Sequence, residues 1–237
     1  MFVAAIRSDA EALADVARLG LDTEVPSCPG WTVRMLVGHL GVLHRWVTQI
    51  VGTRSQARIP RNSITGPAPD EDLVAWFVIG ATALADQLEQ LHPDEPVWNW
   101  SLRPNVGAFW PRRMAHETAI HRWDGQNAYG RAGPIHRALA ADGVAEVLEV
   151  WLPSPPDIEP VTIDAVFRLL CTDIPSEWTF ALRDGHIVEV GSEATTVTVS
   201  ATASDLDLFM WGRQRPGATV EGDRAALDRL LTMGWSL

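Results

Sequence analysis

The sequence predicts an α plus α+β protein, in which an N-terminal four-helix bundle precedes a small α+β domain with an antiparallel sheet. Apolar residues recur with helical spacing over the first ~150 residues, where strand patterns are largely absent. A proline-rich segment at 153–160 is then unsuited to a helix or a central strand. Beyond it the apolar period changes to two, which is typical of strands. The expected domains are therefore residues 1–152 and 161–237.

The first helix is marked by an apolar stripe with three- and four-residue spacing, formed by Val3, Ile6, Ala10, Leu13 and Val16. We expect this helix to end at Gly20, because glycine is common just beyond a helix C-terminus. The following segment, 21–31, contains Pro26, Pro29 and Gly30, so it cannot be helical throughout.

Four further helices follow in the first domain. They are expected at 32–51, about 70–91, 110–124 and about 135–151. Thr32 and Asp70 are residue types that commonly cap helix N-termini, and they would begin the second and third helices. Long loops precede the third and fourth helices. Four main helices plus the additional one at 135–151 fit an up-and-down bundle with one or two long crossovers.

The second domain begins with a hairpin signal. Asp184 and Gly185 separate two short strand-like runs, and this dipeptide is typical of tight hairpin turns. Thr202 with Asp205 resembles a capping box, which predicts a helix start. The expected elements are strands at 178–182, 187–190, 195–201 and 218–221, and helices at 202–211 and 223–231.

Composition limits the classes of partner. The net charge is −11, and the 19 basic residues are all Arg and scattered along the chain, so neither nucleic acid nor an anionic membrane is expected. No apolar run reaches transmembrane length, and residues 1–3 lead directly into an amphipathic helix without a signal-peptide pattern. Cys28 and Cys171 lack disulfide or metal spacing, which favours a reduced, cytoplasmic protein.

The helix at 110–124 carries the strongest functional signal. Glu117 and His121 are four residues apart, so they stack on one face, and that face is otherwise apolar. A buried carboxylate and imidazole are costly unless something pairs with them, and a metal ion is a common partner. His116 with Glu117 suggests a HExxH zinc-protease helix, but position 120 is Ile. His116 lies roughly 140° around the helix from His121 at ~100° per residue, on a different face.

A third candidate ligand lies in the helix at 32–51. His39 interrupts an apolar stripe there, so it is expected to face the same core as Glu117 and His121. Three protein ligands leave an open coordination position, which is the catalytic rather than the structural pattern. The alternative is that each histidine is buried and satisfied by an ordinary hydrogen bond. A di-iron site is disfavoured because the chain has only one such acidic–His pair.

Three segments resemble a known family. They are 25–34 with 37–40, 113–124, and the C-terminal run 202–206 with 211–213 and 222–223. Together they are similar to the mycothiol-dependent maleylpyruvate isomerase family, whose N-terminal part resembles the DinB-like metal-binding bundles. The resemblance covers nearly the whole chain. It implies a divalent metal of the zinc type held by His39, Glu117 and His121, with mycothiol, a low-molecular-weight thiol, as cosubstrate.

The expected reaction follows from such a site. A thiol that binds a metal is deprotonated and can attack a small electrophilic substrate. Reversible addition to a conjugated double bond isomerises cis to trans, whereas displacement of a leaving group gives a thiol conjugate. The sequence leaves isomerase and S-transferase open. A non-catalytic metal- or ligand-binding protein of the DinB-like superfamily is the alternative of a different class.

Four further residues are candidates for supporting roles. The resemblance suggests that an Arg of the second domain binds a substrate carboxylate, and Arg213 is the candidate, with satisfaction of a helix end as the alternative. Asp124 either orients His121 or caps the helix end. Cys28 is expected to be a small buried hydrophobe rather than a nucleophile. The tryptophans are expected mostly in the core, and Trp31, like Trp46, is also a candidate for lining the cavity.

Overall fold

The computed structural model describes the chain except for residues 69–71, 154–158, 192–193, 214–216 and 234–237. The chain divides into two compact units, Met1–Gly133 and Pro134–Leu237. The division lies ahead of the expected linker at 153–160, most of which falls outside the described residues. The predicted helix at 135–151 therefore belongs to the second unit rather than to the bundle.

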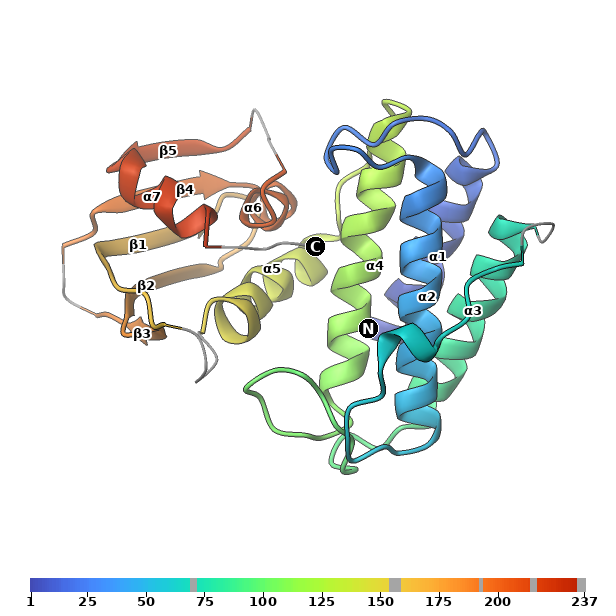
Figure 1. The fold of residues 1–237 in the computed structure, drawn as a ribbon. Coiled ribbons are helices and arrows are strands. Elements are labelled where there is room, and N and C mark those ends of the chain that lie inside the picture. The colour runs from blue at the N-terminus through green and yellow to red at the C-terminus, as the bar shows by residue number, and fades with distance from the viewer. Residues whose placement is uncertain (69–71, 154–158, 192–193, 214–216, 234–237) are drawn as a thin grey trace. The chain divides into compact units, whose positions relative to one another are not determined.

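Four long helices form the first unit among its described residues, and Figure 1 shows their arrangement. They are α1 (Phe2–Ala17), α2 (Val33–Gly52), α3 (Leu73–Glu89) and α4 (Phe109–Ala128), with a short 3-10 turn, η1 (Arg61–Ser63). Helix α1 packs against α3 and α4, and α2 packs against the same two helices. The expected four-helix bundle is confirmed, and its core lies among the apolar stripes of all four helices.

Side-chain caps fix two of the helix starts. The Thr32 side chain accepts a hydrogen bond from the Met35 amide, as its N-cap prediction requires. The cap expected at Asp70 lies outside the described residues. Asp72 caps α3 instead, because its carboxylate accepts hydrogen bonds from the amides of Val74 and Ala75.

Close packing of α2 on α3 depends on a glycine. An added Cβ at Gly41 would lie 2.1 Å from Cζ3 of Trp76. The guanidinium of Arg45 lies over the same indole, with its Cζ 3.6 Å from the ring centroid. Its Nη2 also donates to the Trp76 carbonyl at 2.6 Å. Gly41 therefore allows the indole to lie against the α2 backbone.

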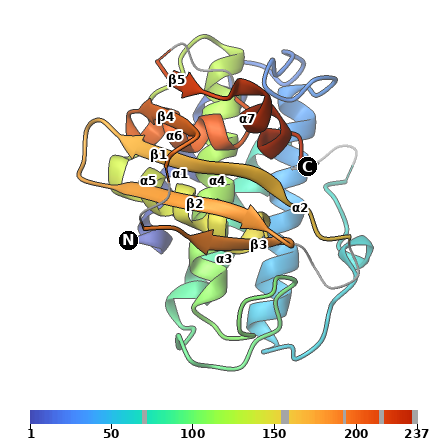
Figure 2. The ribbon, with the colours of Figure 1, turned by 90° about the vertical axis from the view of Figure 1, so that its left-hand side faces the viewer.

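The second unit contains three helices, a π-helical turn and five strands among its described residues. They are α5 (Arg137–Glu146), η2 (Val147–Trp151), β1 (Ile163–Cys171), β2 (Glu177–Arg183), β3 (His186–Glu189), β4 (Val197–Ala201), α6 (Ala203–Met210), β5 (Thr219–Gly222) and α7 (Arg224–Leu231). The strands form one sheet in the order β3-β2-β1-β4-β5 (Figure 2). Helix α5 packs against α6, and both α6 and α7 pack against β1 and β4.

The sheet is mixed rather than wholly antiparallel as predicted. Strand β1 pairs parallel to β4, while the other three pairings are antiparallel. The predicted hairpin is confirmed, with Asp184 and Gly185 at φ values of 47° and 72°, as a type I′ turn requires. The α plus α+β class is thus correct, and the parallel pair is the detail that the sequence pattern misses.

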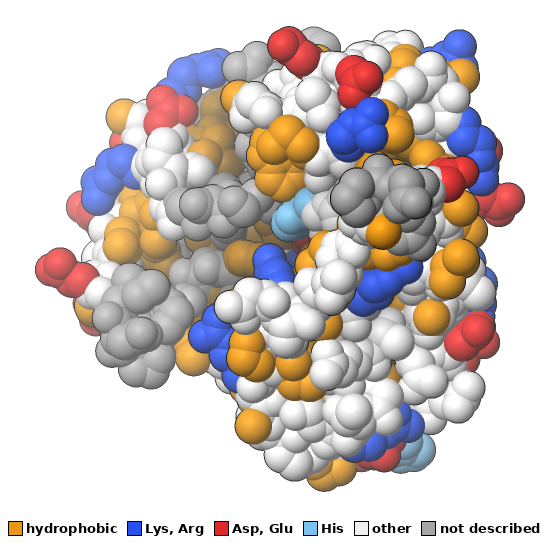
Figure 3. All heavy atoms as spheres, turned by 45° about the vertical axis from the view of Figure 1, so that its right-hand side comes forward, with side chains coloured by type: hydrophobic (Ala, Val, Ile, Leu, Met, Phe, Trp, Pro, Cys, Tyr) orange, Lys and Arg blue, Asp and Glu red, His pale blue; other side chains and the backbone are white. Residues whose placement is uncertain are grey.

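None of the described helices has both the length and the apolarity that a membrane span requires. On the face shown in Figure 3, basic and acidic side chains are interspersed with hydrophobic ones. Basic side chains do not gather into one area on that face, in keeping with the scattered arginines of the sequence.

Candidate metal centre

The three predicted ligands come together in the bundle. His39 lies on α2, and Glu117 and His121 lie four residues apart on α4. Oε1 of Glu117 lies 3.6 Å from Nε2 of His39 and 3.4 Å from Nε2 of His121. The three donor atoms all lie within 4.8 Å of one another. Two helices distant in sequence therefore direct one carboxylate oxygen and two imidazole nitrogens at one point.

The donor set fits a divalent cation. Ligand atoms held about 2.1 Å from a tetrahedral zinc ion are about 3.4 Å apart, close to the 3.6 Å and 3.4 Å that separate Oε1 of Glu117 from the two imidazole nitrogens. The Nε2 atoms of His39 and His121 are buried and have no hydrogen-bond partner. Buried polar atoms without partners are costly, and an ion at their point of convergence would satisfy both.

Each of the two α4 ligands also forms a polar contact through the side-chain atom that does not face the cluster. Nη2 of Arg113 donates to Oε2 of Glu117 at 2.7 Å, which leaves Oε1 directed at the histidines. Nδ1 of His121 lies 3.0 Å from Oδ2 of Asp124. Of the two roles considered for Asp124, this contact favours orientation of His121, since the C-cap of α4 is Tyr129. The part played by Arg113 was not anticipated, although its position four residues before Glu117 is a readable signal for an ion pair.

Electrostatics keep the carboxylate charged and the imidazole basic in the absence of metal. Burial by itself raises the pKa of Glu117, but the neighbouring His121, His39 and Arg113 outweigh it and hold the pKa well below its usual range. Burial lowers the pKa of His121, but Asp124 and Glu117 together raise it to about 9. At neutral pH the metal-free site therefore holds a proton on His121, between two carboxylates.

An indole covers one side of the centre. The ring of Trp31 lies with its centroid 5.0 Å from that of His39 and 6.5 Å from that of His121. Its loop is fixed by the bridge between Glu24 and Thr32 and by a hydrogen bond from the Val25 amide to the Trp31 carbonyl. 

The remaining histidines of α2 and α4 have other surroundings. The ring of His116 packs edge-on against Phe2, with centroids 6.0 Å apart, and is not part of the ligand cluster. Nε2 of His44 donates to the hydroxyl of Thr118, whose own proton goes to the Met114 carbonyl. Burial lowers the pKa of His44 to about 3, so this imidazole is neutral.

Cys28 and Arg213 also occupy defined positions. Sγ of Cys28 lies 3.6 Å from Oδ2 of Asp124, and the residue is buried. Cys171 is a second free thiol in the other unit, where burial raises its pKa to about 11. Arg213 follows the C-cap of α6 in the second unit, and its Nη1 donates to the Trp211 carbonyl at 2.7 Å.

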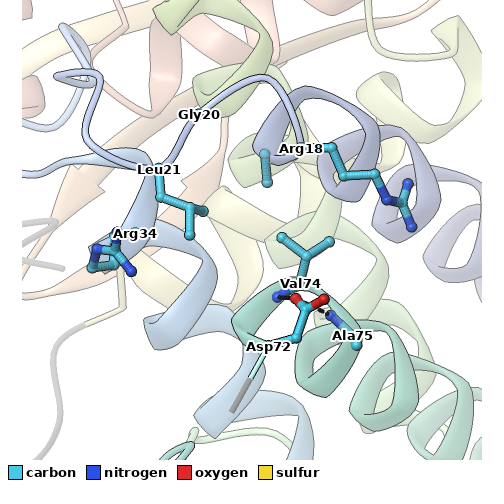
Figure 4. Close-up of a pocket in the computed structure, with 8 residues that line it drawn as sticks. Arg18, Gly20, Leu21, Arg34, Asp72, Val74 and Ala75 are labelled. Atoms are coloured by element: carbon cyan, nitrogen blue, oxygen red, sulfur yellow. Dashed lines mark hydrogen bonds between the residues drawn. The ribbon is translucent and has the colours of Figure 1, made fainter. Parts of the chain in front are cut away.

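The first unit also has a surface pocket that is distinct from the ligand cluster (Figure 4). It lies where the end of α1 and the start of α2 approach the start of α3. Its lining consists of Ala17, Arg18, Gly20, Leu21, Arg34, Asp72, Val74 and Ala75. Both arginines are paired on the surface, Arg18 with Asp15 and Arg34 with Asp22. No residue of the candidate metal centre lines this pocket.

The fold and site define a class: a two-unit protein with a helical bundle that holds a His-Glu-His cluster and a following α+β unit. Family comparison agrees with both parts. Residues 2–125 match the mycothiol maleylpyruvate isomerase N-terminal domain, and residues 138–229 match the C-terminal domain of the same family, MDMPI. The chain therefore belongs to the mycothiol maleylpyruvate isomerase family, and the two matches flank the observed division at residue 133.

Solved structures show the same fold. The chain is similar to the crystal structure of a mycothiol-dependent maleylpyruvate isomerase, with 14% identity, a TM-score of 0.58 and coverage of 93% of this chain and 91% of the other. A histidine-to-alanine mutant of such an isomerase gives a TM-score of 0.63 with the same identity and coverage. Comparison with curated proteins gives no significant match.

Proposed function

We propose that this protein is a divalent-metal-dependent enzyme that uses mycothiol, or a closely related thiol, to isomerise or conjugate a small electrophilic substrate. The observation that carries the proposal is the convergence of His39 Nε2, Glu117 Oε1 and His121 Nε2, two of them buried without a hydrogen-bond partner. Family membership supports the choice of thiol and of isomerisation. Zinc is the proposed ion, since two imidazoles and one carboxylate are a common catalytic zinc set.

An ion with three protein ligands keeps a position for an exogenous ligand and lowers the pKa of a thiol bound there. The protein side chains then have separate tasks. His39, Glu117 and His121 hold the ion, and Arg113 and Asp124 keep the α4 ligands oriented. The indole of Trp31 limits the approach of water from its side of the centre.

The neighbouring carboxylates favour thiol chemistry over hydrolysis. Activation of water by a catalytic carboxylate requires a group that is free to accept a proton. Glu117 is assigned as a ligand and its second oxygen accepts from Arg113, while Asp124 is hydrogen bonded to His121. A thiolate, once formed, needs no such base. It adds to one carbon of a conjugated double bond, the new single bond rotates, and expulsion of the thiolate restores the double bond in the trans form.

Arg213 is proposed to bind a substrate carboxylate. This assignment follows from the family resemblance, in which an arginine of the C-terminal domain has that role. A guanidinium can bind a carboxylate through two parallel hydrogen bonds. Replacement of Arg213 by Met should therefore raise KM for carboxylate-bearing substrates and leave metal content unchanged.

The test combines metal analysis with thiol-dependent turnover. Wild-type protein should contain about one zinc ion per chain, as one three-ligand site implies. His121→Ala should lose both metal and turnover. His116→Ala is the matched control on the same helix, and it should retain the metal because His116 is outside the cluster. Turnover of a small conjugated electrophile should require an added low-molecular-weight thiol and should stop on chelation.

Three results would contradict the proposal. Unchanged metal content in His121→Ala would remove the assigned ligands. Rapid hydrolysis of substrates without any thiol would replace thiol chemistry by water activation. Stoichiometric metal binding without turnover of any thiol-reactive substrate would instead favour the alternative of a non-catalytic metal-binding protein. We also propose a cytoplasmic location, because the proposed cosubstrate is a reduced thiol.

A further inference from the structure

We propose that Asp124 is a positioning residue that fixes His121 in the tautomer needed for metal binding, and that the thiol of Cys28 holds Asp124 in place. The proposal rests on the metal site proposed above. It extends that site by two residues that do not bind the ion themselves. The three groups form one chain of contacts, from Cys28 through Asp124 to His121.

The first step is the contact between Asp124 and His121. The two residues are three apart on α4, and Asp124 is fully buried. Oδ2 of Asp124 lies 3.0 Å from Nδ1 of His121. An ionised carboxylate only accepts hydrogen bonds, so Nδ1 must carry the proton. The lone pair of the neutral ring is then on Nε2, the atom that faces Glu117.

The second step is the contribution of Cys28. Its Sγ lies 3.6 Å from the same Oδ2, and the thiol has one weak proton to donate. The backbone of Cys28 is fixed at both ends, because its amide donates to the Val25 carbonyl and its carbonyl accepts from the Trp31 amide. Two donors, from α4 and from the loop before α2, thus converge on one oxygen of Asp124.

The same turn places two side chains around His121. Gly30 adopts a φ of 82°, a conformation suited to glycine, and the turn returns the chain from Cys28 to Trp31. Cys28 contacts the carboxylate partner of the His121 ring, and the Trp31 indole lies nearly parallel to that ring at an interplanar angle of 21°. The loop before α2 therefore contributes to the orientation of a ligand on α4.

A different interpretation is that Cys28, His121 and Asp124 are themselves metal ligands, since their donor atoms also lie within 4.8 Å of one another. The hydrogen-bond distance between Nδ1 and Oδ2 argues against an ion between them. An ion bound to Cys28, Asp124 and Nδ1 of His121 would also require Nδ1 to lose its proton. His121 would then have to bind two ions, because its Nε2 is assigned to the ion held with His39 and Glu117. The stoichiometry of metal binding separates these two interpretations.

The experiment compares zinc affinities of metal-free wild type, Asp124→Asn, Cys28→Ala, Cys28→Ser and Cys28→Val by competition with a chromogenic chelator. Asparagine can accept from or donate to Nδ1, so it no longer selects one tautomer. The affinities are compared at pH 9, where a proton on His121 competes little with the ion, and there Asp124→Asn should weaken zinc binding by about 10- to 100-fold. Cys28→Ala should weaken it by a smaller factor, and Cys28→Ser, which keeps a donor, should restore most of the wild-type affinity.

Cobalt spectra and stoichiometry complete the test. The d–d absorption of the cobalt-loaded protein should change in Asp124→Asn and Cys28→Ala but not in Cys28→Ser, because only the first two disturb the ligand orientation. Wild-type affinity in both Asp124→Asn and Cys28→Ala would overturn the proposal, as would two ions per chain. His121→Ala distinguishes failure of the positioning proposal from failure of the proposed metal site. Unchanged zinc binding in His121→Ala would refute the metal site itself.

Should Asp124→Asn not fold, the Cys28 variants still decide. Thermal unfolding of each metal-free variant shows which proteins are folded before affinities are compared. Equal affinity in Cys28→Ala and Cys28→Ser, both at the wild-type value, would contradict the role of the thiol. A loss in Cys28→Ala that Cys28→Ser restores but Cys28→Val does not restore supports it, because valine refills the space of the thiol without supplying a donor.

Discussion

Metal binding should compete with a proton on His121. The pKa of this imidazole is raised to about 9 in the metal-free protein, because Asp124 and Glu117 stabilise the charged form more than burial disfavours it. Because pH 7 lies about two units below this pKa, an incoming ion must displace a proton from His121 at that pH. One pH unit corresponds to about 1.4 kcal/mol, so the apparent affinity at pH 7 should be about 100-fold lower than at pH 9.

Isothermal titration calorimetry at pH 7 in buffers of different ionisation enthalpy measures the protons released. The expected value is about one proton per zinc ion bound, and the logarithm of the association constant should rise by about one per pH unit until about pH 9. A pH-independent affinity between pH 6 and 9, with no proton released, would refute the raised pKa. His116→Ala is the control, and it should show the same proton release because His116 is outside the cluster.

The same proton contributes to the stability of the metal-free protein. A pKa raised on folding stabilises the folded state fully below the unfolded-state value of about 6.5, and this stabilisation is lost as pH rises through about 9. Metal-loaded protein should lack this alkaline loss, since the ion replaces the proton. The two forms should therefore differ most in their unfolding midpoints at alkaline pH.

Two further predictions concern the bundle itself. Burial lowers the pKa of His44 to about 3, so the contribution of its neutral form to stability is complete above pH 6.5. The free energy of unfolding should therefore fall by about 2 kcal/mol between pH 7 and pH 5. Urea unfolding of wild type and His44→Gln at the two pH values measures this difference, and an equal pH dependence in both proteins would contradict it. Gly41→Ala should destabilise the protein by about 1–3 kcal/mol, because the new methyl would lie 2.1 Å from Cζ3 of Trp76. Gly38→Ala on the same helix has nothing within 4 Å of its added Cβ and should be neutral or slightly stabilising, so similar losses in both would refute the packing argument.

Much of the site can be predicted from sequence because helical geometry is regular. The four-residue spacing of Glu117 and His121 fixes their common face, and the apolar neighbours of His39 indicate that it faces the core. The hydrogen bonds that surround the ligands are harder to predict from the sequence. The contact of Cys28 with Asp124 depends on a loop turn whose geometry no periodicity encodes.

The class of the fold and the β2–β3 hairpin can be predicted from the sequence, but the parallel pairing of β1 with β4 cannot. The sequence pattern does not reveal strand β1, because apolar Val166 and Leu170 stand where the alternation of apolar and polar residues in a half-buried strand would place polar side chains. Without β1, the parallel pairing with β4 could not be foreseen. The division between units was expected at the proline-rich 153–160, but α5 packs against α6 and belongs to the second unit. Proline marks a break in regular structure, and tertiary packing decides which unit a helix joins.

The most direct test of the central claim is a crystal structure of the zinc-loaded protein with anomalous diffraction data above and below the zinc edge. We predict one anomalous peak in the bundle, within bonding distance of Nε2 of His39, Oε1 of Glu117 and Nε2 of His121. A peak bound instead by Cys28, Asp124 and Nδ1 of His121 would contradict it. So would zinc-loaded crystals that show no peak in the bundle.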